Sequence, residues 1–246
     1  MKTKGVFILL LILMFLLTGC FLTNSKQKMA EFESKIIETL TTKYNKDFEI
    51  ISTSKKGNES TGHFYISEVK CLDDGIIFTS EYNTDNYLSK RWSIEATSFY
   101  GSIFEDRYGD CEYSVKFSTR KDNQIGAEKL TYKEITERIT QNNPGQSYIE
   151  ITSIVYKNDT FDTTAESEFI YELLNMEPMN IIDSTFTIRI VYVEGESKNL
   201  NIEYPNSRDE WHELISKKYT IANFVADFIY EISSPEDIYK KFEVYK

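Results

Sequence analysis

Apolar residues recur along the chain with two distinct periods, and these periods predict its secondary structure. Between Met29 and Tyr44, apolar side chains repeat every three or four residues, which is the spacing of one buried helix face. From Thr185 to Val193, apolar and polar residues mostly alternate, which is typical of a strand. Helical segments lie between groups of such strands. They do not alternate with single strands, as they would in a fold built of repeated βαβ units. The pattern therefore predicts an α+β fold, with amphipathic helices packed on mostly antiparallel sheets.

The predicted elements fall into two groups. The first group has helices at 25–44 and 85–108 and strands at 48–52, 64–72, 76–82 and 112–118. The second group has strands at 148–156, 185–193 and 200–204, and helices that begin at the capping boxes of Thr131, Thr163 and Ser207 and at Pro235. We expect the helical segment after Ser207 to continue through Phe224 and Val225 to Ile229.

A polar stretch at 120–128 separates the two groups and is the best candidate linker. We therefore expect two small sub-domains, at residues 28–120 and 121–246. In an alternative division, the strand at 112–118 belongs to the second sheet, and the boundary moves to about Gly109. Within the first group, Asp74-Gly75 indicates a tight hairpin, because a type I′ turn needs positive φ at both central positions.

The first 20 residues contain a targeting signal. Lys2 and Lys4 precede an unbroken apolar run at 6–17. This run is shorter than the ~20 residues that a helix needs to span a bilayer, and it has the length of a signal-peptide core. Leu17-Thr18-Gly19-Cys20 follows at its end. This tetrapeptide resembles the lipobox of bacterial lipoproteins, in which Leu, a small residue and Gly or Ala precede Cys.

The resemblance to bacterial lipoproteins covers residues 1–20 and does not extend to the globular part. It implies cleavage of the signal peptide (1–19) between Gly19 and Cys20, and a diacylglyceryl group on the Cys20 sulfur. Residues 20–27 would then be a lipidated tether. Because two acyl chains give stable anchoring, the resemblance implies a location on the extracytoplasmic face of the cell membrane. The alternatives are an ordinary secretory signal and an uncleaved membrane helix.

The net charge narrows the range of partners. The 246-residue chain carries −11, of which the two lysines of the signal peptide contribute +2, so the remainder carries −13. Nucleic acid requires a basic surface, and so does a protein that lies flat on anionic lipid. We therefore expect no nucleic-acid partner, and we expect the membrane contact to be the lipid on Cys20.

Two cysteines remain for the globular part, Cys71 and Cys111. Both lie in predicted strands of the first sub-domain, in a compartment where disulfides persist. The sequence leaves two alternatives open, one Cys71–Cys111 disulfide or two buried free thiols. A zinc site is not expected, because the chain has no Cys-x-x-Cys and two histidines in all.

Three motifs contain residue types that can carry out chemistry. Asp209, His212 and Glu213 share one face of a predicted helix, a spacing that could hold a divalent cation, but the paired His of helical zinc motifs is missing and a solvated first helical turn explains them better. His63 is a lone histidine at the head of a strand. Ser52-Thr53-Ser54-Lys55 matches the Ser-x-x-Lys of penicillin-recognising enzymes, yet it ends a strand and the companion motifs are absent. We therefore predict no catalytic, cofactor-binding or metal-binding residues.

These observations predict a lipid-anchored, non-enzymatic protein of the cell envelope. It would bind a macromolecular partner, such as another envelope protein, or have a structural role. The alternative is a small-ligand-binding, transport-associated lipoprotein, and an envelope hydrolase is the third hypothesis. No cofactor is expected.

Replacing Cys20 by Ala removes the sulfur that would accept the lipid, so we expect an uncleaved and unlipidated precursor. Intact-mass spectrometry of protein purified from cells measures cleavage and lipidation together, with Cys71→Ala as the matched control that keeps both. A Cys20→Ala protein that is processed normally and retained on the membrane would contradict the lipoprotein hypothesis.

Overall fold

The computed structural model describes residues 26–58, 62–82, 84–120, 124–142, 147–176, 185–200, 202–205, 207–227 and 232–245. The signal peptide and Cys20 lie outside this part of the chain. The protein forms two compact units, Met1–Tyr87 and Leu88–Lys246, each with its own sheet. Among the described residues, no helix has the length and apolar character to cross a membrane.

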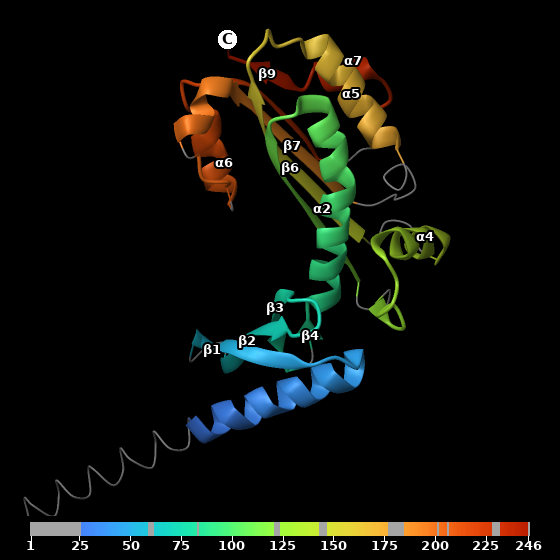
Figure 1. The fold of residues 1–246 in the computed structure, drawn as a ribbon, viewed down its shortest axis with the longest axis vertical. Coiled ribbons are helices and arrows are strands. Elements are labelled where there is room, and N and C mark those ends of the chain that lie inside the picture. The colour runs from blue at the N-terminus through green and yellow to red at the C-terminus, as the bar shows by residue number, and fades with distance from the viewer. Residues whose placement is uncertain are drawn as a thin grey trace, which may run out of the picture. The chain divides into compact units, whose positions relative to one another are not determined.

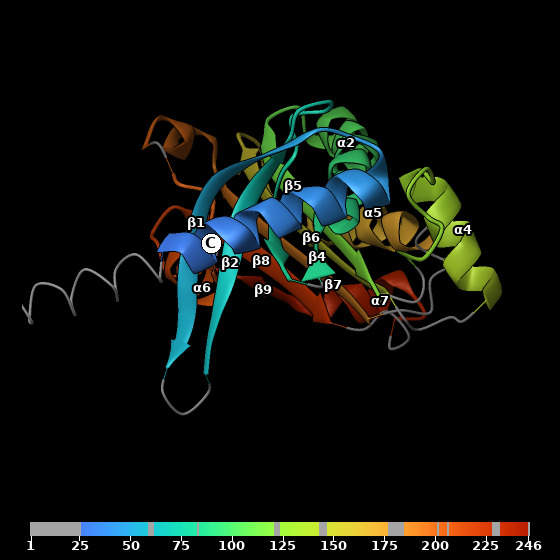
Figure 2. The ribbon, with the colours of Figure 1, turned by 90° about the horizontal axis from the view of Figure 1, so that it is seen from below.

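The first unit is a four-stranded antiparallel sheet with one helix. Its strands follow one another in space as in sequence: β1 (Phe48–Asn58), β2 (Gly62–Cys71), β3 (Ile77–Glu81) and β4 (Thr84–Asp85). The helix at residues 26–44 crosses β1 and β2 (Figure 2). It buries Ile36, Leu40 and Tyr44, and the Tyr44 ring lies 6.1 Å from that of Phe48 on β1. The predicted amphipathic helix is thereby confirmed.

The predicted hairpin between β2 and β3 is also present. The Gly75 N–H donates to the carbonyl of Cys71 at 2.9 Å, and Gly75 has a φ of 73°. Asp74 does not share this positive φ, so the turn is not type I′. Instead, the Asp74 carboxylate stabilises the turn by accepting the N–H of Ile76 at 3.1 Å.

Asp74 also ties this turn to two other parts of the first unit. Its carboxylate lies 2.5 Å from Lys46 Nζ, and it accepts a hydrogen bond from the Tyr87 hydroxyl. Burial opposes ionisation of Asp74, but the hydrogen bonds from Lys46, Tyr87 and Ile76 outweigh burial and lower its pKa to about 2. The ionised form is therefore favoured by folding.

A five-stranded sheet forms the centre of the second unit. Its order is β5 (Cys111–Thr119), β6 (Ser147–Lys157), β7 (Thr185–Glu194), β8 (Thr220–Asp227) and β9 (Phe242–Val244). All neighbours are antiparallel except β6 and β7, which are parallel and are joined by a connection that contains α5 (Thr163–Asn175). The sheets are therefore mostly antiparallel, and the α+β prediction is confirmed.

The helices divide between the two faces of this sheet. Figure 1 shows α6 (Arg208–Ile215) on one side of β6 and β7, and α2 (Tyr87–Tyr108), α4 (Tyr132–Asn142) and α5 on the other. The remaining elements are the 3₁₀ helix η2 (Gly195–Leu200) and the short α7 (Pro235–Tyr239). On the α2 side, ring contacts such as Trp92–Phe117 at 5.9 Å and Tyr108–Tyr192 at 6.1 Å fill the core.

Of the three predicted capping boxes, the one at Thr131 forms with both of its hydrogen bonds, and the one at Ser207 has the hydrogen bond to the serine hydroxyl. The Thr131 hydroxyl accepts the N–H of Glu134 at 3.3 Å while the Glu134 carboxylate accepts the N–H of Thr131 at 2.8 Å. The Ser207 hydroxyl accepts the N–H of Glu210 at 3.2 Å. The third expectation is wrong, because Asp162 rather than Thr163 caps α5.

Glu166, which we expected to cap α5, is instead 1% exposed in the core. The Tyr108 hydroxyl donates to its carboxylate at 2.6 Å, the Tyr192 hydroxyl donates at 3.1 Å, and Lys157 Nζ lies at 3.2 Å. Burial, together with the negative charge of Glu166, raises the pKa of Tyr108 well above 10. This network attaches α5 to α2 and to the sheet.

The expected boundary between residues 120 and 121 is wrong. Strand β5 pairs with β6 along its whole length, from Cys111 with Val155 to Thr119 with Ser147. It therefore belongs to the second sheet, as in the alternative division, but the chain passes from the first unit to the second between Tyr87 and Leu88 rather than near Gly109. The division of the chain into two units follows from backbone pairing between distant segments. The local polar stretch at 120–128 does not mark it.

Two elements differ from the prediction. Phe224 and Val225 lie in β8, not in a helix, because β8 pairs with β7 through Ala222–Asp227 and with β9 through Ala222–Phe224. A short segment rich in apolar residues fits helix and strand periods alike. Phe228 and Ile229 lie outside the described residues. The strand expected at 200–204 is not formed: η2 ends at Leu200, and 202–205 have no regular structure.

Helix α2 protects the outer edge of the second sheet. Strand β5 is an edge strand, and side chains of α2 take the place of a neighbouring strand. The Ser93 hydroxyl accepts the N–H of Phe117 at 2.9 Å, and the Thr97 hydroxyl accepts the N–H of Val115 at 3.1 Å. Both hydroxyls also lie within 3.3 Å of the carbonyl of the same residue. Edge groups that would otherwise pair with another chain are thereby satisfied.

One turn further along α2, Gly101 allows the same close approach. A Cβ at this position would lie 2.2 Å from the ring of Tyr113 on β5. Ser93, Thr97 and Gly101 are spaced four residues apart, so they form one small-residue stripe along the helix. Trp92, Ala96, Tyr100 and Phe104 form the adjacent buried stripe, whereas Phe99 is 43% exposed.

We expect Ser93→Ala and Thr97→Val each to lower the free energy of unfolding by about 1–2 kcal/mol, because each leaves a buried N–H of β5 without an acceptor. Urea denaturation measures the change. Ser102→Ala is the matched control, since the exposed Ser102 hydroxyl bonds only within α2. Equal effects of Ser93→Ala and Ser102→Ala would contradict the edge-protection argument.

The lowered pKa of Asp74 predicts an acid-sensitive contribution to stability. Ionised Asp74 stabilises the fold fully above its ordinary pKa of 3.8, and this stabilisation disappears as the pH falls through about 2. We expect Asp74→Asn to cost about 1–2 kcal/mol at pH 6 and less at pH 2. Urea denaturation at both pH values measures this difference. A cost that does not depend on pH would show that the carboxylate charge is not responsible.

Candidate functional site

The face of the second sheet that carries α6 is apolar at one end and polar at the other. At the apolar end, Ile154, Val191 and Val193 pack with Trp211 and Leu214 of α6. Toward the other end of the same strands, every second residue still points to this face, but these residues are polar. They are Tyr148, Glu150 and Thr152 on β6 and Thr187 and Arg189 on β7.

The strand register brings these polar residues together. Glu150 is paired with Thr187, Thr152 with Arg189, and Arg189 with Val225 on β8. Glu150 and Arg189 are thus diagonal neighbours on adjacent strands, a separation that long side chains can reach across. The arrangement depends on the parallel pairing of β6 with β7. This pairing brings together segments that are almost 40 residues apart in the sequence.

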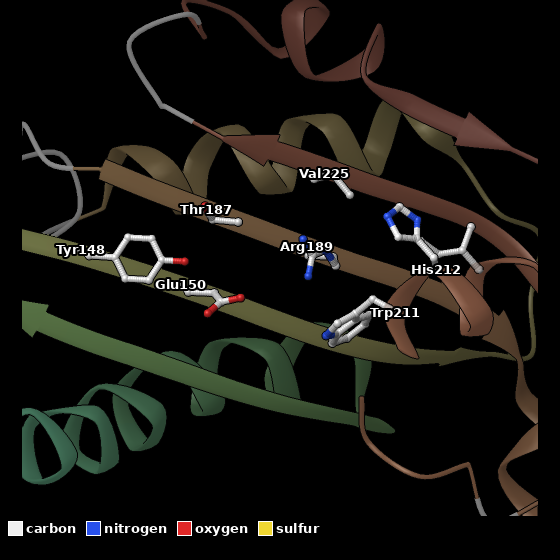
Figure 3. Close-up of a pocket in the computed structure, with 8 residues that line it drawn as sticks. Tyr148, Glu150, Thr187, Arg189, Trp211, His212 and Val225 are labelled. Atoms are coloured by element: carbon white, nitrogen blue, oxygen red, sulfur yellow. The ribbon is translucent and has the colours of Figure 1, made fainter. Parts of the chain in front are cut away.

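A pocket of about 300 Å³ lies over this polar region, with α6 as one wall. Its floor is formed by side chains of β6, β7 and β8, and Trp211, His212 and Ile215 line it from α6. Figure 3 shows Arg189 between Glu150 and Val225, with Trp211 and His212 at one end and Tyr148 at the other. Trp211 is buried, Arg189 and Glu150 are half-buried, and His212 is exposed at the rim.

Arg189 is the central charged group of the pocket. Its guanidinium carbon lies over the Trp211 indole, 5.5 Å from the ring centroid, in a cation–π arrangement. Within the described residues, the guanidinium has no hydrogen bond or ion pair. Glu150, the acidic residue among the described lining residues, instead pairs with Lys116 of β5, whose Nζ lies 3.2 Å from its carboxylate. A positive group is therefore held in a concave site with its hydrogen-bond donors available.

The predicted site residues lie in several different places. His212 lines the pocket, whereas Glu213 pairs with Lys217 at 2.6 Å and lines a second groove on the other side of α6. Asp209 lines neither pocket. Across the part of the chain that the structure describes, no three His, Cys, Asp or Glu residues are grouped as metal ligands would be.

His63 and the Ser-x-x-Lys motif at 52–55 lie in the first unit. His63 is exposed on β2, and Ser52 and Lys55 are exposed on β1. Ser52 follows a register shift in the pairing of β1 with β2. A strand does not place Ser and Lys of a Ser-x-x-Lys motif side by side, because residues three apart point to opposite faces. The motif has no catalytic geometry here.

Cys71 and Cys111 lie in different units of the protein. Both are free thiols, Cys71 at the end of β2 in the first unit and Cys111 at the start of β5 in the second. Cys71 is buried and Cys111 is half-buried. Burial, together with the charge of Glu105, raises the pKa of Cys111 to about 11, so this thiol is protonated and unreactive at neutral pH.

Sequence reasoning did not identify the Arg189 pocket. The pattern did place Thr187 and Arg189 on the face of β7 opposite Ile188 and Ile190, together with Val191 and Val193. This mixed face was the signal in the sequence that could have indicated the pocket. Its apolar half must be buried against another element, whereas its polar half can face solvent. The identity of the cover, α6, and of the neighbouring strands could not be read from the pattern.

No protein-family model matches the chain, and no curated protein matches it. The fold is similar to that in the crystal structure, at 2.55 Å resolution, of a DUF5037 family protein from Ruminococcus gnavus ATCC 29149. The TM-score is 0.50 and the sequence identity is 15%, and the match covers 85% of this chain and 97% of that chain. At this identity, the similarity shows a shared fold and nothing about activity.

Proposed function

We propose that this protein is a non-enzymatic binding protein of the cell envelope, anchored by lipid on Cys20 to the extracytoplasmic face of the membrane. The lipobox-like sequence at 17–20 supports the anchor. The pocket over the polar end of this face, with half-buried Arg189 and Glu150 in it, supports a binding role. Its partner would be another envelope macromolecule that contacts this face.

The observation that carries the proposal is the state of Arg189. A half-buried guanidinium usually engages a carboxylate, because burying an unpaired charge is costly. Here the adjacent carboxylate, Glu150, is engaged by Lys116, and Arg189 is supported by the ring of Trp211. Such an arrangement keeps a recognition group oriented without neutralising it, which suits binding better than stabilisation of the fold.

The size of the pocket favours a second candidate function. At about 300 Å³, it lies at the small end of the range for ligand pockets. This observation favours a small-ligand-binding, transport-associated lipoprotein. In that case the bound molecule would be a free metabolite rather than part of a macromolecule.

The proposed function predicts that partners contact the rim of the pocket in living cells. We expect a photo-crosslinking amino acid at position 212 to give a discrete cross-linked product on intact cells. The same amino acid at position 102, on the exposed side of α2, is the matched control and should give several-fold less. Immunoblotting and mass spectrometry measure the yield and identify the product.

Equal cross-linking at positions 212 and 102 would contradict binding through this face. A ligand-dependent rise in melting temperature without any cross-linked macromolecule would instead favour the small-ligand function. Turnover of a substrate that one side-chain substitution abolishes would overturn the non-enzymatic proposal.

A further inference from the structure

We infer that the Arg189 pocket recognises a carboxylate attached to a small apolar group. This inference rests on the proposed function, because it names the chemistry of a ligand for the same face. The carboxylate could belong to a free organic acid or to the end of a peptide chain. Both present the same planar anion beside an apolar body.

The geometry of Arg189 selects a planar anion. Trp211 lies against the guanidinium, so the N–H groups in the plane of the guanidinium remain as donors. Two of these donors match the two oxygens of a carboxylate and form parallel hydrogen bonds with it. Trp211 is a positioning residue in this scheme, since it is buried and holds the guanidinium in place.

The local charge also favours an anion. Glu150 is the single acidic residue among the described lining residues, and Lys116 balances its charge at 3.2 Å. The charge of Arg189 is therefore not balanced within the pocket, which is positive although the whole chain carries −11. The acidic surface elsewhere repels an anion, whereas the positive charge of this pocket attracts it.

The remaining lining residues define the body of the ligand. Val225 on β8 and Ile215 on α6 are both half-buried and line the pocket close to Arg189, and Tyr148 lines its other end. Val225, Ile215 and the ring of Tyr148 offer apolar surface, and the polar Thr187 and His212 also line the pocket. The small volume limits the body to about the size of one aromatic or branched side chain.

The test compares acids with their uncharged amides on the full-length protein purified in detergent. The probes are 3-phenylpropionate and acetyl-Gly-Gly-Phe, each with the corresponding amide, and calorimetry measures binding at concentrations up to about 10 mM. We expect the acid to bind and its amide to bind at least about tenfold more weakly, because the amide lacks the anionic oxygens. Comparison of the two acids distinguishes a free acid from a peptide end.

Substitutions at Arg189 give the second arm of the test. We expect Arg189→Gln to weaken acid binding about tenfold or more, and Arg189→Lys to weaken it less, because Lys keeps the charge but not the two-pronged geometry. Arg138→Gln on α4 is the matched control: Arg138 is half-buried in the same unit, outside the pocket, and should leave binding unchanged. Melting temperatures and circular dichroism establish that each variant is folded.

Equal binding of acid and amide, acid binding that survives Arg189→Gln in a folded protein, or no binding of either acid would overturn the carboxylate assignment. The proposed function fails separately, by equal cross-linking at positions 212 and 102. A protein that cross-links through position 212 but does not bind the acids would keep its binding role and lose this assignment. If Arg189→Gln fails to fold, Arg189→Lys and the comparison of acid with amide still decide the outcome.

Discussion

The close contact between α2 and the edge strand β5 is the constraint on which the second unit depends. Ser93 and Thr97 satisfy backbone groups of Phe117 and Val115, and Gly101 leaves room for the ring of Tyr113. An unsatisfied edge strand would expose N–H and C=O groups to pairing with another chain. Because this edge is closed by a helix, the sheet ends at β5, and α2 is fixed along one face of it.

With α2, α4 and α5 on one face, the opposite face has α6 as its cover (Figure 1). A helix of eight residues spans only about 12 Å, which is enough for the apolar half of β6 and β7 but not for the whole face. The other half carries polar residues, and α6 forms one wall of a pocket that lies over them. The candidate site is thus a consequence of a short helix on a long sheet.

Polar groups are treated differently on the two faces of this sheet. On the α2 side, Glu166 is fully buried and receives hydrogen bonds from Tyr108 and Tyr192, with Lys157 as its cation. On the α6 side, Arg189 is half-buried, and a ring rather than a carboxylate supports it. The first arrangement satisfies a buried charge and holds elements together. The second leaves a charge ready to bind, which is why Arg189 and not Glu166 marks the candidate site.

The sequence by itself determined the α+β class, the helix at 26–44, the hairpin at Gly75 and the outline of α2 and β7, because local periodicity and turn chemistry are enough for these. It also carries the lipobox-like signal, which lies outside the described residues. The tertiary structure alone decided that β5 joins the second sheet, that Phe224 lies in a strand, and that β6 and β7 are parallel. It alone placed Arg189 against Trp211 beside a carboxylate already engaged by Lys116. These features depend on backbone pairing and packing between distant segments, and such long-range contacts leave no periodic trace in the sequence around any one of them.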